Sequence, residues 1–377
     1  MFVTTESFRN LSKNTIPFLD VGYTYRTVQD EIDAAVSRVL QSGQYIGGDE
    51  VSLFESRFAQ FVEASHCVGV ANGLDAITLS LRALGVGTGD EVIVPSHTFI
   101  ATWLAVSETG ATPVPVDTAP NGFNLDIDRI PSAITPRTRG IIVVHLYGVP
   151  VDLDKVADVA RNHGLWVIED AAQAHGARYK GRRIGAHSAL TTWSFYPGKN
   201  LGAFGDAGAI TTDDAQLADA VRLMGNYGAA QKYEHKVLGV NSRLDPLQAA
   251  VLDVKLRYLE SWNQRRSDIA RTYCEQLAGI DDLELPLFSG NNSWHLFVIR
   301  SNKRDALRMK LEQSGIGYGV HYPKPPHRQE PYRDGHSKTD MSVTDRLSTE
   351  VLSLPIGPHL DDESVEYVIH HLRQTLK

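Results

Sequence analysis

The sequence predicts an α/β protein built on a mostly parallel sheet, with a smaller α/β unit after it. Short apolar runs rich in β-branched residues recur between residues 67 and 212, and helix-compatible stretches separate most of them. These runs are continuously hydrophobic rather than alternating, which is typical of strands covered on both faces. A long helical run and then a mixture of helix and strand follow, which predicts a second unit at the C-terminal end.

Two amphipathic helices come first. Residues 26–42 place Val28, Ile32 and Val36 on one face, and residues 49–62 show the same helical spacing of apolar side chains. The strands of the predicted sheet follow, at residues 67–70, 91–94, 112–116, 140–144, 165–168, 191–195 and 209–212.

The C-terminal part begins with a helical run at residues 245–278, which the polar residues 263–266 interrupt. The elements predicted after it are a strand at 294–299, a helix at 303–314, a strand at 317–321 and a closing helix at 361–376. We therefore expect an N-terminal arm (1–16), a large domain (17–250) and a small C-terminal domain (251–377) that includes the long connecting helix.

Composition points to small-molecule partners. A formal net charge of −8 gives no general basic field, which argues against nucleic acid or a membrane as partner. Cys67 and Cys274 are the only cysteines, so no disulfide framework is expected and a cytoplasmic location fits best. No apolar run approaches the roughly 18 residues of a spanning helix. The histidines show no zinc-ligand spacing, so we expect no metal site.

Lys199 and Asp170 are the residues that indicate chemistry. Lys199 follows the strand at 191–195 and precedes a glycine-rich loop, whereas Asp170 comes just after the apolar strand at 165–168, at the sheet edge where α/β proteins hold ligands. A lysine nucleophile and an acid beside a pyridinium nitrogen are what pyridoxal phosphate requires. The alternatives are a solvated loop lysine and a simple helix cap.

Two further motifs fit a flat, phosphorylated ligand. Residues 72–76 follow a strand and open a helix, so the amides near Gly73 could face a phosphate, although an ordinary turn capped by Asn72 remains the alternative. Phe99 follows the strand at 91–94 and could stack on a ring, or it could be a core aromatic.

Together these segments resemble the DegT/DnrJ/EryC1/StrS family of nucleotide-sugar aminotransferases over almost the whole chain from residue 17. The motifs behind the resemblance are residues 42–47, 72–76, 89–95, 95–102, 169–173, 194–199, 226–228, 239–244 and 321–323.

The resemblance implies a fold of the aspartate-aminotransferase type (fold type I), with a seven-stranded mostly parallel sheet in the large domain. It also implies a homodimer with shared active sites and pyridoxal 5′-phosphate as cofactor. Lys199 matches the Schiff-base lysine. The other matches are Asp170 to the pyridine-nitrogen partner, Phe99 to the stacking aromatic, Gln173 to the residue near the phenolic oxygen, Gly73, Leu74 and Ser194 to phosphate contacts, and Asn241 to a phosphate ligand of the neighbouring subunit.

The resemblance further implies that Tyr227, Arg243, His321 and Tyr322 serve the sugar and nucleotide. Two comparisons with the family pattern matter. Many relatives have a hydroxyl residue in place of Leu74, so backbone amides must supply more of the phosphate contacts here. Relatives that dehydrate sugars have histidine at the position of Lys199, which argues against a dehydratase.

By resemblance, the activity is transfer of an amino group from L-glutamate to a nucleotide-linked keto sugar. Residues 72–75 with Gln173, together with residues 226–228 and 241–245, look most like members that act at C-3 of dTDP-linked 3-keto-6-deoxyhexoses. The alternatives are a C-4 aminotransferase on a UDP-, dTDP- or GDP-4-keto-6-deoxyhexose and a non-catalytic regulator on the same fold.

Overall fold

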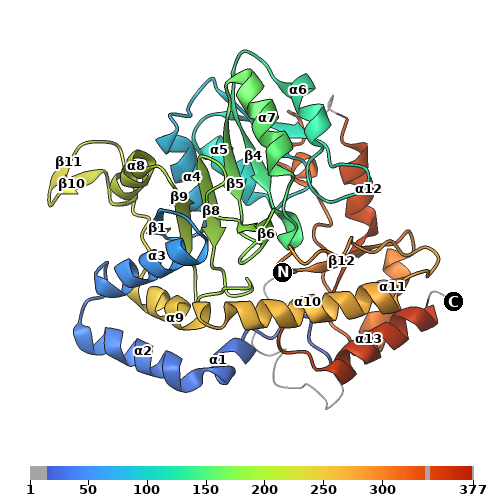
Figure 1. The fold of residues 1–377 in the computed structure, drawn as a ribbon. Coiled ribbons are helices and arrows are strands. Elements are labelled where there is room, and N and C mark those ends of the chain that lie inside the picture. Colours follow the sequence, from blue (N-terminus) through green and yellow to red (C-terminus); the bar gives the residue numbers. More distant parts are fainter. Residues whose placement is uncertain (1–14, 336–339, 376–377) are drawn as a thin grey trace.

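The computed structural model describes residues 15–335 and 340–375, so the predicted arm (1–16) lies almost wholly outside the described residues. Within the described part, seven strands form one sheet in the order β1-β9-β8-β5-β4-β2-β3 (Figure 1). Its strands are β1 (His66–Val70), β2 (Glu91–Pro95), β3 (Thr112–Val116), β4 (Thr138–Val144), β5 (Trp166–Asp170), β8 (Leu190–Ser194) and β9 (Gly208–Thr212). Each overlaps a predicted strand. Neighbours are parallel except at β9, which is antiparallel to both β1 and β8, so the predicted mostly parallel sheet is confirmed.

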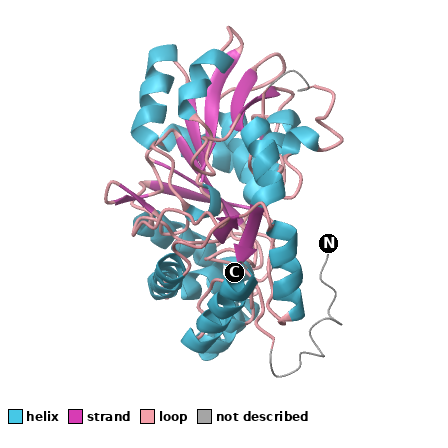
Figure 2. Ribbon diagram, turned by 90° about the vertical axis from the view of Figure 1, so that its right-hand side faces the viewer, coloured by secondary structure: helices cyan, strands magenta, loops and turns pink. Residues whose placement is uncertain are grey.

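Helices cover both faces of this sheet (Figure 2). Successive strand residues point to opposite faces, so Ile141 and Val143 of β4 join one apolar core and Ile142 joins the other. The first core includes residues of α3 (Asp49–Phe61), α7 (Leu153–His163) and α9 (Pro246–Leu256), and the second includes residues of α4 (Gly73–Ala83), α5 (Ala101–Glu108) and α8 (Ala215–Gly225). Burial on both faces explains why the strands read as continuous apolar runs.

A separate apolar core lies in the C-terminal part, where α10 (Leu259–Gln276), α11 (Arg304–Gln313) and α13 (Asp362–Thr375) pack around the antiparallel pair β12 (Phe297–Arg300) and β13 (Val351–Leu354). The remaining elements are α1 (Tyr23–Thr27), α2 (Gln29–Ser42), α6 (Ile130–Ala133), α12 (Ser342–Glu350), the short pairs β6 (Arg178–Tyr179) with β7 (Arg182–Arg183) and β10 (Ala229–Gln231) with β11 (Glu234–His235), and single 3₁₀ turns at Ile127–Arg129, Leu146–Gly148 and Pro326–Arg328. Among residues 15–335 and 340–375 no helix has the length and apolarity to span a membrane.

The prediction for residues 245–278 was wrong about where the helical run breaks. The structure ends α9 at Leu256 and begins α10 at Leu259, whereas the polar residues 263–266 lie inside α10. Tyr258 donates its amide hydrogen to the carbonyl of Lys255, a tightened last turn. Arg257 forms an ion pair of 2.9 Å with Glu31, and Tyr258 donates its hydroxyl to the same carboxylate. Contacts with α2 therefore accompany the break.

The predicted strand at residues 317–321 was also wrong. Only Gly319 forms a β-bridge there, to Ser353, while Gly317 donates its amide to the carbonyl of Ile16. The backbone of this segment thus divides its hydrogen bonds between two partners instead of following one strand. The prediction missed β13, which pairs with β12.

Candidate active site

The loops at the carboxyl ends of the parallel strands bring most of the predicted residues together. Strands β2, β4, β5 and β8 run in the same direction, so their carboxyl ends meet at one edge of the sheet. Asp170 ends β5 and Ser194 ends β8, whereas Phe99 and Lys199 follow β2 and β8. An open α/β sheet binds its ligand at this edge.

Asp170 is a buried acid, 7% exposed, held by two hydrogen bonds. Its Oδ1 accepts the amide hydrogen of Ala172 at 3.1 Å, and its Oδ2 accepts the hydroxyl hydrogen of Thr102 at 3.0 Å. Burial raises the pKa of this carboxyl group, while the Ala172 amide and the nearby Lys199 cation oppose the rise. A carboxylate has about four acceptor positions, so this one can still accept from a ligand.

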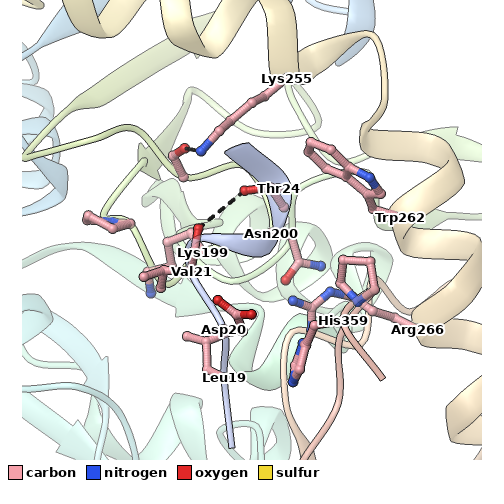
Figure 3. Close-up of a pocket in the computed structure, with 13 residues that line it drawn as sticks. Leu19, Asp20, Val21, Thr24, Lys199, Asn200, Lys255, Trp262, Arg266 and His359 are labelled. Carbon is pink, nitrogen blue, oxygen red and sulfur yellow. Dashed lines mark hydrogen bonds between the residues drawn. The ribbon is translucent and has the colours of Figure 1, made fainter. Parts of the chain in front are cut away.

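Lys199 is partly buried in the loop after β8, and Figure 3 shows a pocket that it lines with Asn200 and Arg266. Burial lowers the pKa of its amine to about 8, and the Asp170 carboxylate opposes that shift. Among the described residues no hydrogen bond or ion pair occupies the amine of Lys199. A lysine with a depressed pKa and a free amine has the properties of a nucleophile, and the reading as a solvated loop lysine does not fit this burial.

Gly73 and Ser194 lie against each other. A Cβ on Gly73 would approach the Cβ of Ser194 to 2.7 Å, closer than carbon atoms pack, so the contact requires glycine. Asn72 caps α4 by accepting the amide hydrogen of Asp75 at 2.9 Å, as the alternative interpretation of this motif expected. The amides of Gly73 and Leu74, in the first turn, have no acceptor among the described residues. Free amides at a helix N-terminus favour an anion.

Phe99, Gln173 and Tyr322 form a second side of the site. The Phe99 ring is 56% exposed, so it is not a core aromatic, and its centroid lies 5.8 Å from that of Tyr322. The Gln173 side chain is clamped, because its Oε1 accepts the Tyr147 amide hydrogen at 2.7 Å and its Nε2 donates to the Tyr322 hydroxyl at 3.0 Å. Burial raises the pKa of Tyr322, so this phenol stays protonated at neutral pH.

His321 lies in the same group. Its Nδ1 is 2.7 Å from the hydroxyl oxygen of Ser353, and its carbonyl accepts the hydroxyl hydrogen of Tyr147. Burial first, and then the charge of Lys199, lower the pKa of its imidazole to about 4. His321 is therefore neutral at physiological pH and close enough to Lys199 to sense its charge.

The structure places Tyr227, Asn241 and Arg243 in a different group beside the β10–β11 hairpin. Asn241 forms a β-bridge with Asn226, the guanidinium carbon of Arg243 lies 5.6 Å from the ring centroid of Tyr227, and Arg243 donates to the side-chain oxygen of Asn226 at 3.1 Å. In the part of the chain that the structure describes, no hydrogen bond, ion pair or ring contact joins this group to Lys199.

Sequence reasoning missed Thr102, Tyr147 and His97. Thr102 holds Asp170, and Tyr147 holds Gln173 and is itself 2.8 Å from Nε2 of His97. All three follow strands of the sheet, so their positions at carboxyl strand ends were the available signal. Which of them makes such contacts depends on side-chain packing that no sequence spacing shows.

These residues fit pyridoxal phosphate. The Gly73–Ser194 contact with two free amides suits a phosphate, and the exposed face of Phe99 suits a flat ring. Asp170 retains capacity for a ring N–H, and the amide nitrogen of Gln173 has a second hydrogen beyond the one that Tyr322 accepts. The amine of Lys199 completes the set.

Known proteins are similar to this chain in sequence and in fold. The model of the DegT/DnrJ/EryC1/StrS aminotransferase family matches residues 26–373. A dTDP-3-amino-3,4,6-trideoxy-α-D-glucose transaminase of Streptomyces venezuelae is 51% identical over 363 residues, which are 95% of this chain and 96% of the relative. A dTDP-3-amino-3,6-dideoxy-α-D-galactopyranose transaminase of Aneurinibacillus thermoaerophilus is 48% identical over 356 residues, 94% of this chain and 98% of the relative.

A solved structure agrees with this result. The crystal structure of S. venezuelae DesV in complex with a ketimine intermediate superposes with a TM-score of 0.94 at 50% sequence identity. The superposition covers 96% of this chain and 98% of DesV.

Proposed function

Because the chain belongs to the DegT/DnrJ/EryC1/StrS aminotransferase family, we propose that it transfers an amino group from L-glutamate to C-3 of a dTDP-linked 3-keto-6-deoxyhexose. The product is a dTDP-3-amino-3,6-dideoxyhexose. Two relatives support the position of amination, since both are named for a dTDP sugar with its amino group at C-3. The structural observation behind the chemistry is the free amine of Lys199, with its pKa lowered to about 8, next to the buried Asp170.

Pyridoxal phosphate, when bound, supplies an aldehyde for an amine and a ring that delocalises the negative charge formed at the donor's α-carbon. Lys199 would act as the base: its amine, with a pKa lowered to about 8, would take the proton from the donor's α-carbon and deliver it to the carbon of the cofactor's former aldehyde. Asp170 would hold the ring nitrogen in its protonated form, because an opposite charge in a buried site favours the ionised state of both partners.

The remaining predicted cofactor contacts would bind and orient the cofactor. Gly73, Leu74 and Ser194 would bind the phosphate through amides and a hydroxyl, in the field of the α4 N-terminus. Phe99 would cover one face of the ring, and Gln173, clamped by Tyr147 and Tyr322, would donate to its phenolic oxygen. His321 and Tyr322 would contact the sugar.

A homodimer explains the second group of residues. Asn241, Tyr227 and Arg243 lie apart from Lys199, beside a hairpin whose tip residue Tyr233 is 83% exposed, and Leu238, which follows the hairpin, is 95% exposed. Tyr227 and Val237 are exposed as well, so large exposed side chains cluster along this segment, and a cluster of this kind suits a contact with another molecule. In the proposed dimer this surface meets a second copy, and Asn241 reaches the phosphate of the neighbouring site.

We also propose that the chain has two domains, 17–250 and 251–377, after an N-terminal arm. The enzyme is proposed to be cytoplasmic. The separate C-terminal core supports a second domain, but α9 (Pro246–Leu256), which the boundary at 250 divides, packs in the first core of the large sheet.

Absorption spectroscopy tests the proposal. The protein with pyridoxal phosphate should be yellow, glutamate should bleach the visible band, and Lys199→Ala should abolish the band. Borohydride reduction followed by peptide mapping should place the label on Lys199. A chain that stays colourless with added cofactor supports a non-catalytic regulator.

The position of amination needs a separate experiment. Purified enzyme, glutamate and a panel of dTDP-, UDP- and GDP-linked keto sugars are incubated, and NMR identifies the carbon that carries nitrogen. Preference for 3-keto sugars is expected. Equal turnover of a 4-keto isomer contradicts the C-3 assignment but leaves transamination intact.

A further inference from the structure

Asn200, the residue after Lys199 (Figure 3), has a buried side chain whose amide group is held on both sides. The residue is 6% exposed. Its Nδ2 donates one hydrogen to Oδ1 of Asn263 at 2.9 Å and the other to the carbonyl of Ser293 at 2.8 Å. Its Oδ1 lies 3.1 Å from Nδ1 of His295. The neighbour of the reactive amine is therefore fixed at three points, one in α10 and two in the segment before β12.

These partners determine which way the amide points. The carbonyl of Ser293 can only accept, so the nitrogen of the Asn200 amide must face it. The oxygen then faces His295, whose Nδ1 must carry a hydrogen. Burial, and after it the charge of Lys199, lower the pKa of His295 well below its ordinary value of 6.5, so this ring is neutral and has a single N–H. An aspartate has no N–H to donate and could not make the same contacts.

Two of the partners also hold the segment that follows β5. Asn263 donates an amide hydrogen to the carbonyl of His175 at 2.8 Å, and the hydroxyl of Ser293 donates to the carbonyl of Gln173 at 3.1 Å. Asn200 thus connects two loops at the carboxyl edge of the sheet. One carries the reactive amine, and the other follows the acid that ends β5.

Asn263 has little freedom to move in this network. Its amide oxygen accepts from Asn200 and its nitrogen donates to His175, so turning the amide over would break both bonds. A Cβ on Gly176 would approach Nδ2 of Asn263 to 2.6 Å, so the close approach requires glycine at position 176. The polar residues 263–266 inside α10 therefore include one that faces the large domain and serves as a hydrogen-bonding anchor.

We propose that Asn200 is a positioning residue for Lys199, which holds the reactive amine at a fixed place relative to the ring contacts Asp170 and Gln173. The inference rests on the proposed function. In that function the amine must reach two different carbons in turn, and a displacement of about 1 Å can slow such a step by about 100-fold. The glycine-rich loop at 202–208 has little stiffness of its own. Side-chain contacts at the start of the loop supply the order that its backbone lacks.

Acylation of the cofactor-free protein tests the place of the amine. Burial is the larger cause of the low pKa of Lys199, so an amine released from its place should meet water, and its pKa should rise from about 8 toward 10.5. In Asn200→Ala the midpoint of competitive acylation, followed by peptide mass spectrometry, should rise by about one pH unit or more. Gln248→Ala is the matched control, since Gln248 accepts the amide hydrogen of Phe204 at 2.8 Å, farther along the same loop. The control should keep the midpoint near 8.

Kinetics of the cofactor-loaded enzyme supply a second readout. The kcat of Asn200→Ala should fall at least about tenfold, because Lys199 transfers protons in both half-reactions. The KM values for glutamate and for the keto sugar should stay within about threefold, because both amide hydrogens of Asn200 are already used within the protein. Gln248→Ala should keep kcat within about twofold of wild type.

Three outcomes overturn the inference and leave Asn200 a structural residue. They are an unchanged acylation midpoint in Asn200→Ala, an equal rise in Gln248→Ala, and a rise in KM without a fall in kcat. If Asn200→Ala does not fold, Asn263→Ala decides, since it removes the acceptor of Asn200 and the donor to His175. A midpoint that stays near 8 in that variant also overturns the inference.

The two proposals fail differently. A wild-type enzyme that glutamate does not bleach contradicts the proposed function itself. The acylation midpoint is measured without cofactor or substrate, so an unchanged midpoint in Asn200→Ala contradicts only the positioning role.

Discussion

Thr102 donates its hydroxyl hydrogen to Oδ2 of the buried Asp170 carboxylate across 3.0 Å. Thr102 belongs to the first turn of α5, and Asp170 ends β5, so the bond ties a helix to the sheet at the point where the cofactor ring is proposed to lie. Because the Ala172 amide holds the other oxygen, the carboxylate is fixed before any ligand arrives. A pre-oriented acid binds its partner without a further loss of rotamer freedom.

Asp170→Asn should weaken cofactor binding without lowering the stability of the cofactor-free protein. The pKa of Asp170 is higher in the folded chain than in the unfolded chain. Its ionisation therefore lowers the free energy of unfolding at pH values above the unfolded-state pKa. At acid pH, where the carboxyl group is protonated in both the folded and the unfolded chain, this effect disappears. Without cofactor, the variant should therefore be at least as stable as wild type at pH 8, and the difference should shrink toward acid pH, measured by urea unfolding. Cofactor affinity should fall at least about tenfold, as for a lost charged hydrogen bond. A less stable variant at pH 8 contradicts this interpretation.

The amine of Lys199 should react with acylating reagents at a lower pH than ordinary lysines. Competitive acylation of the cofactor-free protein, followed by peptide mass spectrometry, should give a midpoint near the pKa of about 8 for this residue. Burial lowers the pKa and Asp170 raises it, so Asp170→Asn should move the midpoint to still lower pH. A midpoint that rises in this variant shows that the carboxylate does not act on the amine.

Gly73→Ala should weaken cofactor binding. The added Cβ would approach Ser194 to 2.7 Å and push apart the two sides of the proposed phosphate site. We expect a loss of at least about tenfold in pyridoxal phosphate affinity by spectroscopic titration. Gly87→Ala is the control, because its added Cβ meets nothing within 4 Å. Equal affinity for both variants argues against a phosphate at the α4 N-terminus.

Tyr322→Phe should slow turnover modestly without a large effect on folding. It removes the hydroxyl that accepts from Gln173 Nε2, a bond of 3.0 Å, so the amide loses one of its two anchors. A lost neutral hydrogen bond of about 1 kcal/mol corresponds to a decrease of about fivefold in kcat/KM. Tyr332→Phe is matched, since it removes a hydroxyl 2.9 Å from Ser107 outside the site. Tyr332→Phe should leave kcat/KM unchanged, although it can lower the stability of the protein. An equal loss of kcat/KM in Tyr322→Phe and Tyr332→Phe contradicts a specific role of Tyr322 in the site.

Mixing two inactive variants tests the shared active sites. If Asn241 serves the neighbouring subunit, a dimer of Lys199→Ala with Asn241→Ala contains one site with both residues intact. Random reassociation of equal amounts should restore about a quarter of the wild-type sites, given a symmetric dimer. Activity that does not recover, although sequential purification on two different affinity tags, one on each variant, isolates mixed dimers, places both residues in one subunit's site.

The seven strands of the sheet were predictable because they are five to seven residues long and mostly buried on both faces, so that β2 (Glu91–Pro95) and the end of β4 (Thr138–Val144) read as apolar runs. The break between α9 and α10 was not, because it coincides with contacts from Arg257 and Tyr258 to Glu31, more than 200 residues away in the chain. A local pattern cannot show such a partner. The segment at residues 317–321 has strand-like composition, yet its backbone bonds go to Ile16 and Ser353.

By itself, the sequence determined the seven strands of the large sheet and the placement of Asp170 and Lys199 at or just after the carboxyl ends of strands, because hydrophobic patterning and strand direction are local properties. Only the tertiary structure decided which side chains touch. It set Thr102 on Asp170, clamped Gln173 between Tyr147 and Tyr322, and tied Asn200, the residue after Lys199, to Asn263 and Ser293. Those relationships join segments that are distant in the chain, and burial, which shifts the pKa of Lys199, exists only once the segments pack together.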